Sequence, residues 1–152
     1  MYATHVSRRV KAAPAVVYQA LIDRDAVAAW RVPVGMTSRV HEFDPREGGS
    51  FRVSLTYNDA AGSGKSDAHT DTYRGHFARL VPNELVIEVF EFETSDDALR
   101  GTMTMTTSLT PVDDATDVVI VHEGIPDDVP REDNELGTRM ALDKLAHLVE
   151  RG

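Results

Sequence analysis

The chain has 152 residues, of which 41% are hydrophobic, enough for one domain over residues 1–152 with a core of its own. It contains no cysteine, which excludes disulfides, thiolate zinc sites and a cysteine nucleophile. The net charge of -9 comes without a cluster of lysine or arginine, so nucleic acid and anionic membrane surfaces are poor partners. Because no long apolar segment is present, we expect a cytoplasmic protein that does not insert into a membrane.

The N-terminal part of the chain predicts a strand followed by two short helices. Residues 3–12 have the mixed faces of an edge strand. Pro14 suits the first turn of a helix over residues 14–23, because the N–H that proline lacks has no partner there. Asp25 is expected to cap a second helix, which ends before Pro33. Both helices are too short to be stable alone, so they must pack on something larger.

The middle of the chain alternates apolar and polar residues with a period of two. Phe51, Val53 and Leu55 alternate with polar neighbours, which indicates an antiparallel sheet with one covered and one solvated face. The expected strands are residues 37–44, 49–58, 69–81, 84–93, 99–110 and 115–123.

The last segment, from Pro130 to Gly152, predicts the longest helix. Glu132 and Asp133 lie in its first turn, where carboxylates complement the helix dipole. Residues at helical spacing form one apolar stripe: Thr138, Ala141, Leu142, Leu145, Leu148 and Val149. The order strand, two short helices, six strands, long helix predicts an α+β domain with the helices on one face of the sheet.

Leu136 and Met140 are one helical turn apart on the otherwise charged face of this helix. Apolar side chains in that position are covered either by a loop or by a partner chain. We therefore expect a homodimer through these two residues unless a loop covers them.

Several motifs occur in a fixed order along the chain: PAVVYQALID, EFDPREGGSFRV, YRGHFARLVPNELVIE, TDVVIVHEGIP and NELGTRMALDKLAHLVE. In these motifs the sequence resembles the START-like helix-grip superfamily, in particular the branch related to the activator of the Hsp90 ATPase. The resemblance implies a curved antiparallel sheet of about seven strands around the C-terminal helix, with a cavity between them. It also implies binding of lipids, polyketides or other apolar molecules without a cofactor, and in some members a cyclase or dehydratase activity.

The sequence departs from this family's pattern at two places. The family often has two adjacent tryptophans after the second helix, whereas here Trp30 is followed by Arg31. It also commonly has Gly-Trp early in the last helix, where this chain has Gly137 and Thr138. Replacing tryptophan by threonine removes a side chain that buries about 150–250 Å². The space is either refilled by neighbours or left as cavity.

Four polar residues are candidates for chemistry. His69 and Asp71 are two apart on one strand, where they share a face with Tyr73 and can act as a general base or a ligand anchor. The alternative is that both are solvated at the frayed start of that strand. His122 follows the inward positions of its strand, although a single inward histidine is more often part of the core.

Glu88 is expected to be a buried carboxylate with a raised pKa, or a carboxylate that is paired or at a rim. Six histidines at scattered spacing give no metal-ligand pattern, and the GSGKS stretch at 62–66 lacks the context of a phosphate loop.

The leading hypothesis is a protein that binds a small apolar ligand between the sheet and the last helix. The expected contact residues are Trp30, Phe51, Tyr57, Tyr73, Phe77, Phe90, Met103, Met105, His122, Thr138 and Leu142. A second hypothesis is an enzyme of the polyketide cyclase type that uses His69, Asp71 or His122 for proton transfer. A third is a protein-interaction module linked to a chaperone.

Overall fold

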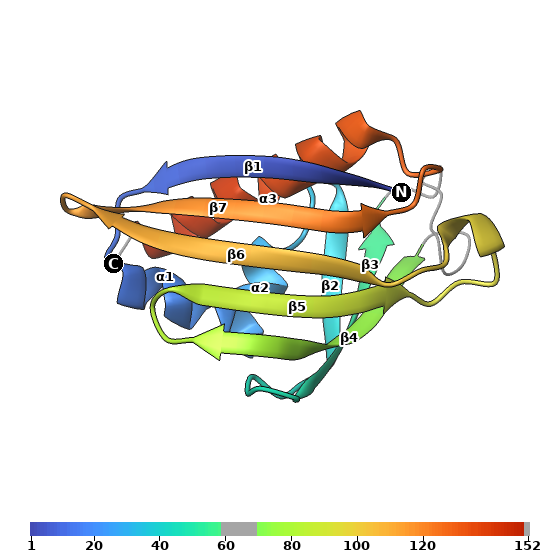
Figure 1. Ribbon diagram of the computed structural model, residues 1–152, viewed down its shortest axis with the longest axis horizontal. Helices are drawn as coiled ribbons and strands as arrows, with labels where there is room; N and C mark the ends of the chain where they lie inside the picture. The colour runs from blue at the N-terminus through green and yellow to red at the C-terminus, as the bar shows by residue number, and fades with distance from the viewer. Residues whose placement is uncertain (59–69, 151–152) are drawn as a thin grey trace.

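The computed structural model describes residues 1–58 and 70–150. Seven antiparallel strands form one curved, open sheet in the order β1-β7-β6-β5-β4-β3-β2 (Figure 1). The strands are β1 (Tyr2–Val10), β2 (Met36–Phe43), β3 (Ser50–Tyr57), β4 (Thr70–Val81), β5 (Leu85–Phe92), β6 (Met103–Val112) and β7 (Ala115–Ile125). The helices are α1 (Pro14–Leu21), α2 (Arg24–Trp30) and α3 (Arg131–Val149), with a 3-10 turn, η1 (Asp97–Leu99). The predicted α+β helix-grip fold is confirmed.

The sheet is a meander from β2 to β7, and β1 joins its far edge by pairing with β7. The chain between β1 and β2 must therefore cross the whole sheet, and α1 and α2 make that crossing on the same face as α3 (Figure 1). α3 packs against β1, α1 and α2. One face of the sheet is thus covered by helices, as the strict alternation of its strands predicts.

The core lies between this face and α3. The helix buries Ala141, Leu142, Leu145, Ala146 and Val149, most of the predicted stripe. The prediction was wrong for Leu148, which is 36% exposed. At 100° per residue this side chain lies at one edge of the stripe, and the helix buries Ala146 at the opposite edge instead.

The strand β4 approaches β5 very closely at Gly75. A Cβ atom there would lie 2.0 Å from the carbonyl oxygen of Val89 and 2.7 Å from the Cα of Phe90. Only glycine tolerates this contact, and a β-bulge follows between Phe77 and Arg79. Both features bend the sheet around the helix side.

Three predicted boundaries were wrong. β6 begins at Met103 rather than at residue 99, because Asp96 accepts a hydrogen bond from the N–H of Ala98 and caps η1. Pro130 is the N-cap of α3, not its first helical residue. Asp25 does not cap α2, since the helix already begins at Arg24. The cap is Asp23, whose carboxylate accepts a hydrogen bond from the N–H of Ala26 at 2.9 Å.

We expect Asp23→Ala to lower the free energy of unfolding by about 1 kcal/mol, because the replaced carboxylate caps the helix. Asp25→Ala is the matched control and removes only a charge near the helix start, worth a few tenths of a kcal/mol. Urea denaturation of both variants measures the difference. Equal losses would show that the cap hydrogen bond of Asp23 does not stabilise α2.

Candidate functional site

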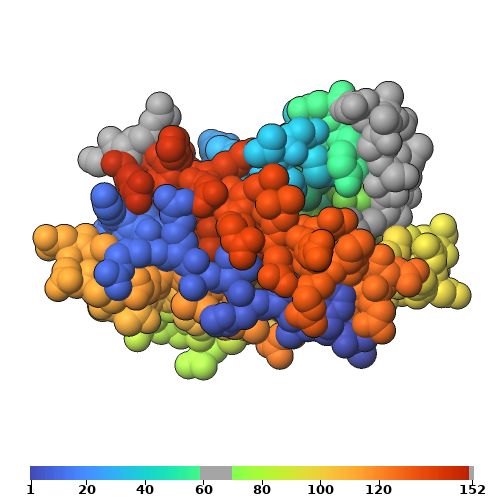
Figure 2. Space-filling view, turned by 90° about the horizontal axis from the view of Figure 1, so that it is seen from above, coloured from blue at the N-terminus to red at the C-terminus, as the bar shows by residue number. Residues whose placement is uncertain are grey.

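A cavity of about 600 Å³ lies between the sheet and the first half of α3. Its walls come from the segment that joins α2 to β2, from β3 to β7 and from the first turns of α3. Figure 2 shows the surface hollowed between the start of α3, in orange-red, and the cyan-to-green strands β2 and β3. The resemblance to helix-grip proteins implies a cavity in this place.

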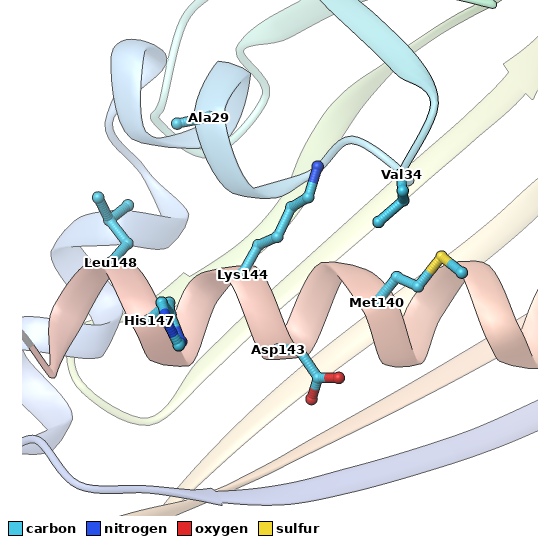
Figure 3. Close-up of a pocket in the computed structure, with 7 residues that line it drawn as sticks. All are labelled: Ala29, Val34, Met140, Asp143, Lys144, His147 and Leu148. Atoms are coloured by element: carbon cyan, nitrogen blue, oxygen red, sulfur yellow. The ribbon is translucent and has the colours of Figure 1, made fainter.

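A second, smaller groove of about 390 Å³ lies on the outer side of α3, beside α2 (Figure 3). Met140 and Val34 face each other there, and Lys144 extends across the groove from α3. The side chains of this groove are mostly exposed or half-buried. The larger cavity is the better candidate, because buried polar groups as well as aromatic rings line it.

The structure brings most of the predicted contact residues to the larger cavity. Those that line it are Trp30, Tyr57, Tyr73, Phe90, Met105, His122 and Thr138. The other four, Phe51, Phe77, Met103 and Leu142, are at most 2% exposed and pack in the core. Phe51, for example, makes an edge contact with Phe77 at 5.2 Å between ring centroids, so these rings fill the space beneath the cavity.

One row of inward side chains crosses the sheet at the cavity. Thr4 of β1 pairs with His122 of β7, which pairs with Met105 of β6, which in turn pairs with Glu88 of β5. Directly opposite residues share a face, so the register alone places these four side chains in line. A polar group at each end and a histidine inside make this row unlike the apolar core beside it.

Arg31 enters the cavity immediately after α2 ends and packs on this row. Its Nη1 donates to the Glu88 carboxylate, and its Nη2 lies 3.5 Å from the sulfur of Met105. The guanidinium carbon lies 5.1 Å from the centre of the Tyr73 ring and 5.7 Å from that of Phe90. Burial is the largest single effect and lowers the pKa of the guanidinium, but the charge of Glu88, the hydrogen bond with it and the interaction with Tyr73 together raise the pKa. The arginine therefore stays charged.

His122 is held in one tautomer by a chain of hydrogen bonds. The hydroxyl of Thr4 donates to Oδ1 of Asn134 at 2.7 Å, which turns the amide Nδ2 toward the histidine. Nδ2 lies 3.1 Å from Nδ1 of His122, so Nδ1 accepts this hydrogen bond and Nε2 carries the ring proton. Burial and, to a lesser extent, the charge of Arg31 lower the pKa of His122 to about 4, although the hydrogen bond with Asn134 acts in the opposite direction. The imidazole is neutral at pH 7.

Two buried polar atoms of the cavity residues have no hydrogen-bond partner among the described residues. They are Nε2 of His122 and the hydroxyl oxygen of Tyr73. Burial also raises the pKa of the Tyr73 phenol, more than the nearby Arg31 lowers it, so the hydroxyl keeps its proton. Both atoms are hydrogen-bond donors without an acceptor.

Asp71 is buried on β4 and lines the cavity on the same face as Tyr73 and Phe77, as the period of two predicts. His69 lies outside the described residues, and so does the GSGKS stretch at 62–66. The predicted His69–Asp71 pair therefore stays a prediction.

Sequence reasoning missed two residues of the site. It treated Arg31 as a lost tryptophan and did not consider Asn134. The replacement of an aromatic residue by Arg31 was a usable signal, because a charged side chain at an inward position needs a buried partner. For Glu88 the sequence left open a raised pKa, a paired carboxylate or a position at a rim. The structure shows the carboxylate paired with Arg31. Asn134 gave no signal, since asparagine is common in the first turn of a helix.

The profile of the family described as Activator of Hsp90 ATPase homolog 1-like protein matches residues 11–150. The chain belongs to this family. The crystal structure of protein CV1439 from Chromobacterium violaceum is similar to this chain. The two sequences are 32% identical, and the alignment covers 97% of each chain at a TM-score of 0.85. No match was found among curated proteins.

Two solved structures of lower sequence identity share the fold of this chain. A protein of Rhodobacter sphaeroides is 19% identical and matches 99% of this chain and 93% of its own at a TM-score of 0.80. A protein of Arthrobacter aurescens is 14% identical and matches 99% of this chain and 87% of its own at 0.81. At these identities the likeness shows the fold alone.

Within residues 1–58 and 70–150, no group of three or more His, Asp or Glu is arranged to hold a metal ion. No helix in this part of the chain is long and apolar enough to cross a membrane.

We expect Glu88→Leu to lower the free energy of unfolding by about 3–5 kcal/mol, because it leaves the Arg31 charge buried without a partner. The double variant Arg31→Met, Glu88→Leu removes both charges and should lose less than half as much. Chemical denaturation of the two proteins compares them. A double variant as unstable as the single one would show that the loss does not come from the unpaired charge.

We expect the stability of the protein to fall as the pH falls from 6.5 toward 4. In this range the unfolded chain protonates His122, whose usual pKa is 6.5, whereas the folded chain does not protonate it until about pH 4. The contribution to the free energy of unfolding is about 2–3 kcal/mol between pH 7 and about pH 4.5. His122→Gln retains every carboxylate, so the wild type should lose that much more than the variant in denaturation at the two pH values. Parallel losses would contradict a buried, neutral histidine.

Proposed function

We propose that this protein binds a small apolar molecule in the cavity between the sheet and α3. The observation that carries the proposal is a cavity of about 600 Å³ with aromatic and thioether walls. Sites for small molecules have volumes of about 300–1,000 Å³ and are mostly apolar with a few placed polar groups. The apolar wall residues are Trp30, Leu55, Tyr57, Tyr73, Phe90, Phe92, Met105 and Ile120.

The rigidity of one wall supports a site that is formed before the ligand arrives. The indole N–H of Trp30 donates to the carbonyl oxygen of Ala20 at 2.8 Å, so the ring ties α2 to α1. Phe90 contacts the rings of both Tyr73 and His122, with centroids 5.7 and 5.4 Å apart. Side chains fixed in this way lose little entropy when a ligand binds.

The room in the cavity is consistent with the departure from the family's Gly-Trp pattern in α3. Thr138 lines the cavity, and its hydroxyl donates to the carbonyl oxygen of Asn134 within the helix. A Cβ atom added to Gly137 would meet no other atom within 4 Å. Neighbouring side chains have therefore not refilled this part of the helix surface.

The cyclase alternative receives less support from the same geometry. A general base needs a nitrogen or oxygen free to take a proton. In His122 the Nε2 atom already carries its proton, and Nδ1 accepts a hydrogen bond from Asn134. This tautomer makes His122 a donor rather than a base, which leaves the alternative with His69 and Asp71.

The apolar side chains of Leu136 and Met140 have a second explanation besides the predicted homodimer. Leu136 is 49% exposed, and both Leu136 and Met140 line the cavity. Apolar side chains at the edge of a ligand cavity need no partner chain. Self-association through these two residues stays a prediction, and no observation favours the chaperone-linked alternative.

We expect Thr138→Trp to fill part of the cavity and to weaken binding of an apolar dye about tenfold or more, while the melting temperature stays equal or rises. Fluorescence titration with the dye and thermal denaturation measure the two effects. Thr138→Val is the control, because it keeps the volume of the side chain and should bind the dye as the wild type does.

Unfolding of Thr138→Trp would show that position 138 is already tightly packed. Unchanged dye binding in a folded Thr138→Trp variant would place the dye outside this cavity and contradict the proposed function. Native mass spectrometry of the purified wild type is the direct search for a natural ligand.

A further inference from the structure

Tyr73 and His122, whose rings both contact Phe90, each have a buried hydrogen-bond donor without a partner among the described residues. We propose that the ligand bound in this cavity is an uncharged molecule with a carbonyl oxygen, and that this oxygen accepts hydrogen bonds from Tyr73 and His122. The inference rests on the proposed function and adds the chemical class of the ligand.

His122 can only donate through the atom that lacks a partner. Its Nδ1 accepts from Asn134, whose orientation Thr4 fixes, so the hydrogen is on Nε2. A ligand amine or ammonium group would leave this N–H without an acceptor. An oxygen with a lone pair is the group that satisfies it.

Tyr73 supplies a second donor beside the same phenylalanine. The ring of Phe90 lies 5.7 Å from that of Tyr73 and 5.4 Å from that of His122. The two side chains thus contact one ring, and both are buried with a polar atom that has no partner among the described residues. Arg31 offers a third donor. Among the described residues its Nη2 donates to the sulfur of Met105, and a thioether sulfur is a weak acceptor.

Buried polar groups without partners are rare in folded proteins, because they lose their hydrogen bonds to water and gain nothing in return. Only three such side-chain atoms occur in residues 1–58 and 70–150. Two of them belong to cavity residues and the third is the hydroxyl of Ser38 on β2. This concentration at one site indicates a binding function for the pair.

The charges around the cavity favour an uncharged ligand over a carboxylate. Glu88 already neutralises Arg31. Three further carboxylates line the same cavity, those of Asp71, Asp128 and Asp133, and the chain as a whole has a net charge of -9. An anionic ligand would enter against this field, and among the described residues that line the cavity the one arginine is already paired.

The test uses fluorene and 9-fluorenone, two three-ring molecules of nearly equal shape that differ by the carbonyl group. Isothermal titration should show that the wild type binds fluorenone about tenfold more tightly than fluorene, the effect of one or two neutral hydrogen bonds. In Tyr73→Phe this preference should fall several-fold, while fluorene binds as before. Tyr18→Phe is the matched control: it removes a hydroxyl from a buried tyrosine that does not line this cavity and should keep the preference.

A second measurement detects the hydrogen bonds to the carbonyl oxygen directly. The carbonyl stretching band of bound fluorenone should lie at lower frequency than in an alkane solvent, because hydrogen bonds weaken the C=O bond, and the shift should shrink in Tyr73→Phe. Fluorene-9-carboxylate tests the charge, and we expect it to bind more weakly than fluorenone.

The outcomes separate this inference from the proposed function. Equal binding of fluorene and fluorenone with an unshifted carbonyl band would overturn the inference and leave apolar binding intact. Tighter binding of the carboxylate would overturn the choice of an uncharged ligand. Failure of both fluorene and fluorenone to bind would contradict the proposed function, and the inference would fall with it.

Discussion

Arg31 and Glu88 form the buried ion pair on which the character of the cavity depends. The carboxylate beside the guanidinium offsets the cost of burying the charge of Arg31. Its charge then acts on its neighbours: it lies over the rings of Tyr73 and Phe90 and helps to keep His122 neutral. The pair therefore gives an otherwise aromatic cavity a polar end without giving it a net charge.

The grip of the sheet on α3 depends on the edge strand β1 as much as on the core. Arg131 donates to the carbonyl oxygen of Ala3, Arg8 pairs with Asp143, and the hydroxyl of Thr4 reaches Asn134. These contacts fix the first turn and the middle of the helix relative to the sheet. The apolar stripe of α3 supplies most of the burial, whereas the polar contacts with β1 fix which side chains face the cavity.

The sequence predicted the fold well, because periods of two and 3.6 residues and the turn residues carry that information locally. The inward direction of His122 followed from the same alternation. The distinction between Tyr73, which lines the cavity, and Phe77, which fills the core, was not available, since it depends on how the sheet bends at Gly75. The path of Arg31 into the cavity was equally hidden, because a helix end does not specify where the next side chain points.

The hydrogen bond from Thr4 to Asn134 joins residues 130 positions apart in the sequence. Thr4 does not line the cavity, yet its hydrogen bond to Asn134 decides which nitrogen of His122 carries the proton. A valine in place of Thr4 would release the amide of Asn134 and allow the histidine to present a lone pair where it now presents a hydrogen. A single substitution on the first strand can thus turn a hydrogen-bond donor of the cavity into an acceptor, although no residue of that strand lines the cavity.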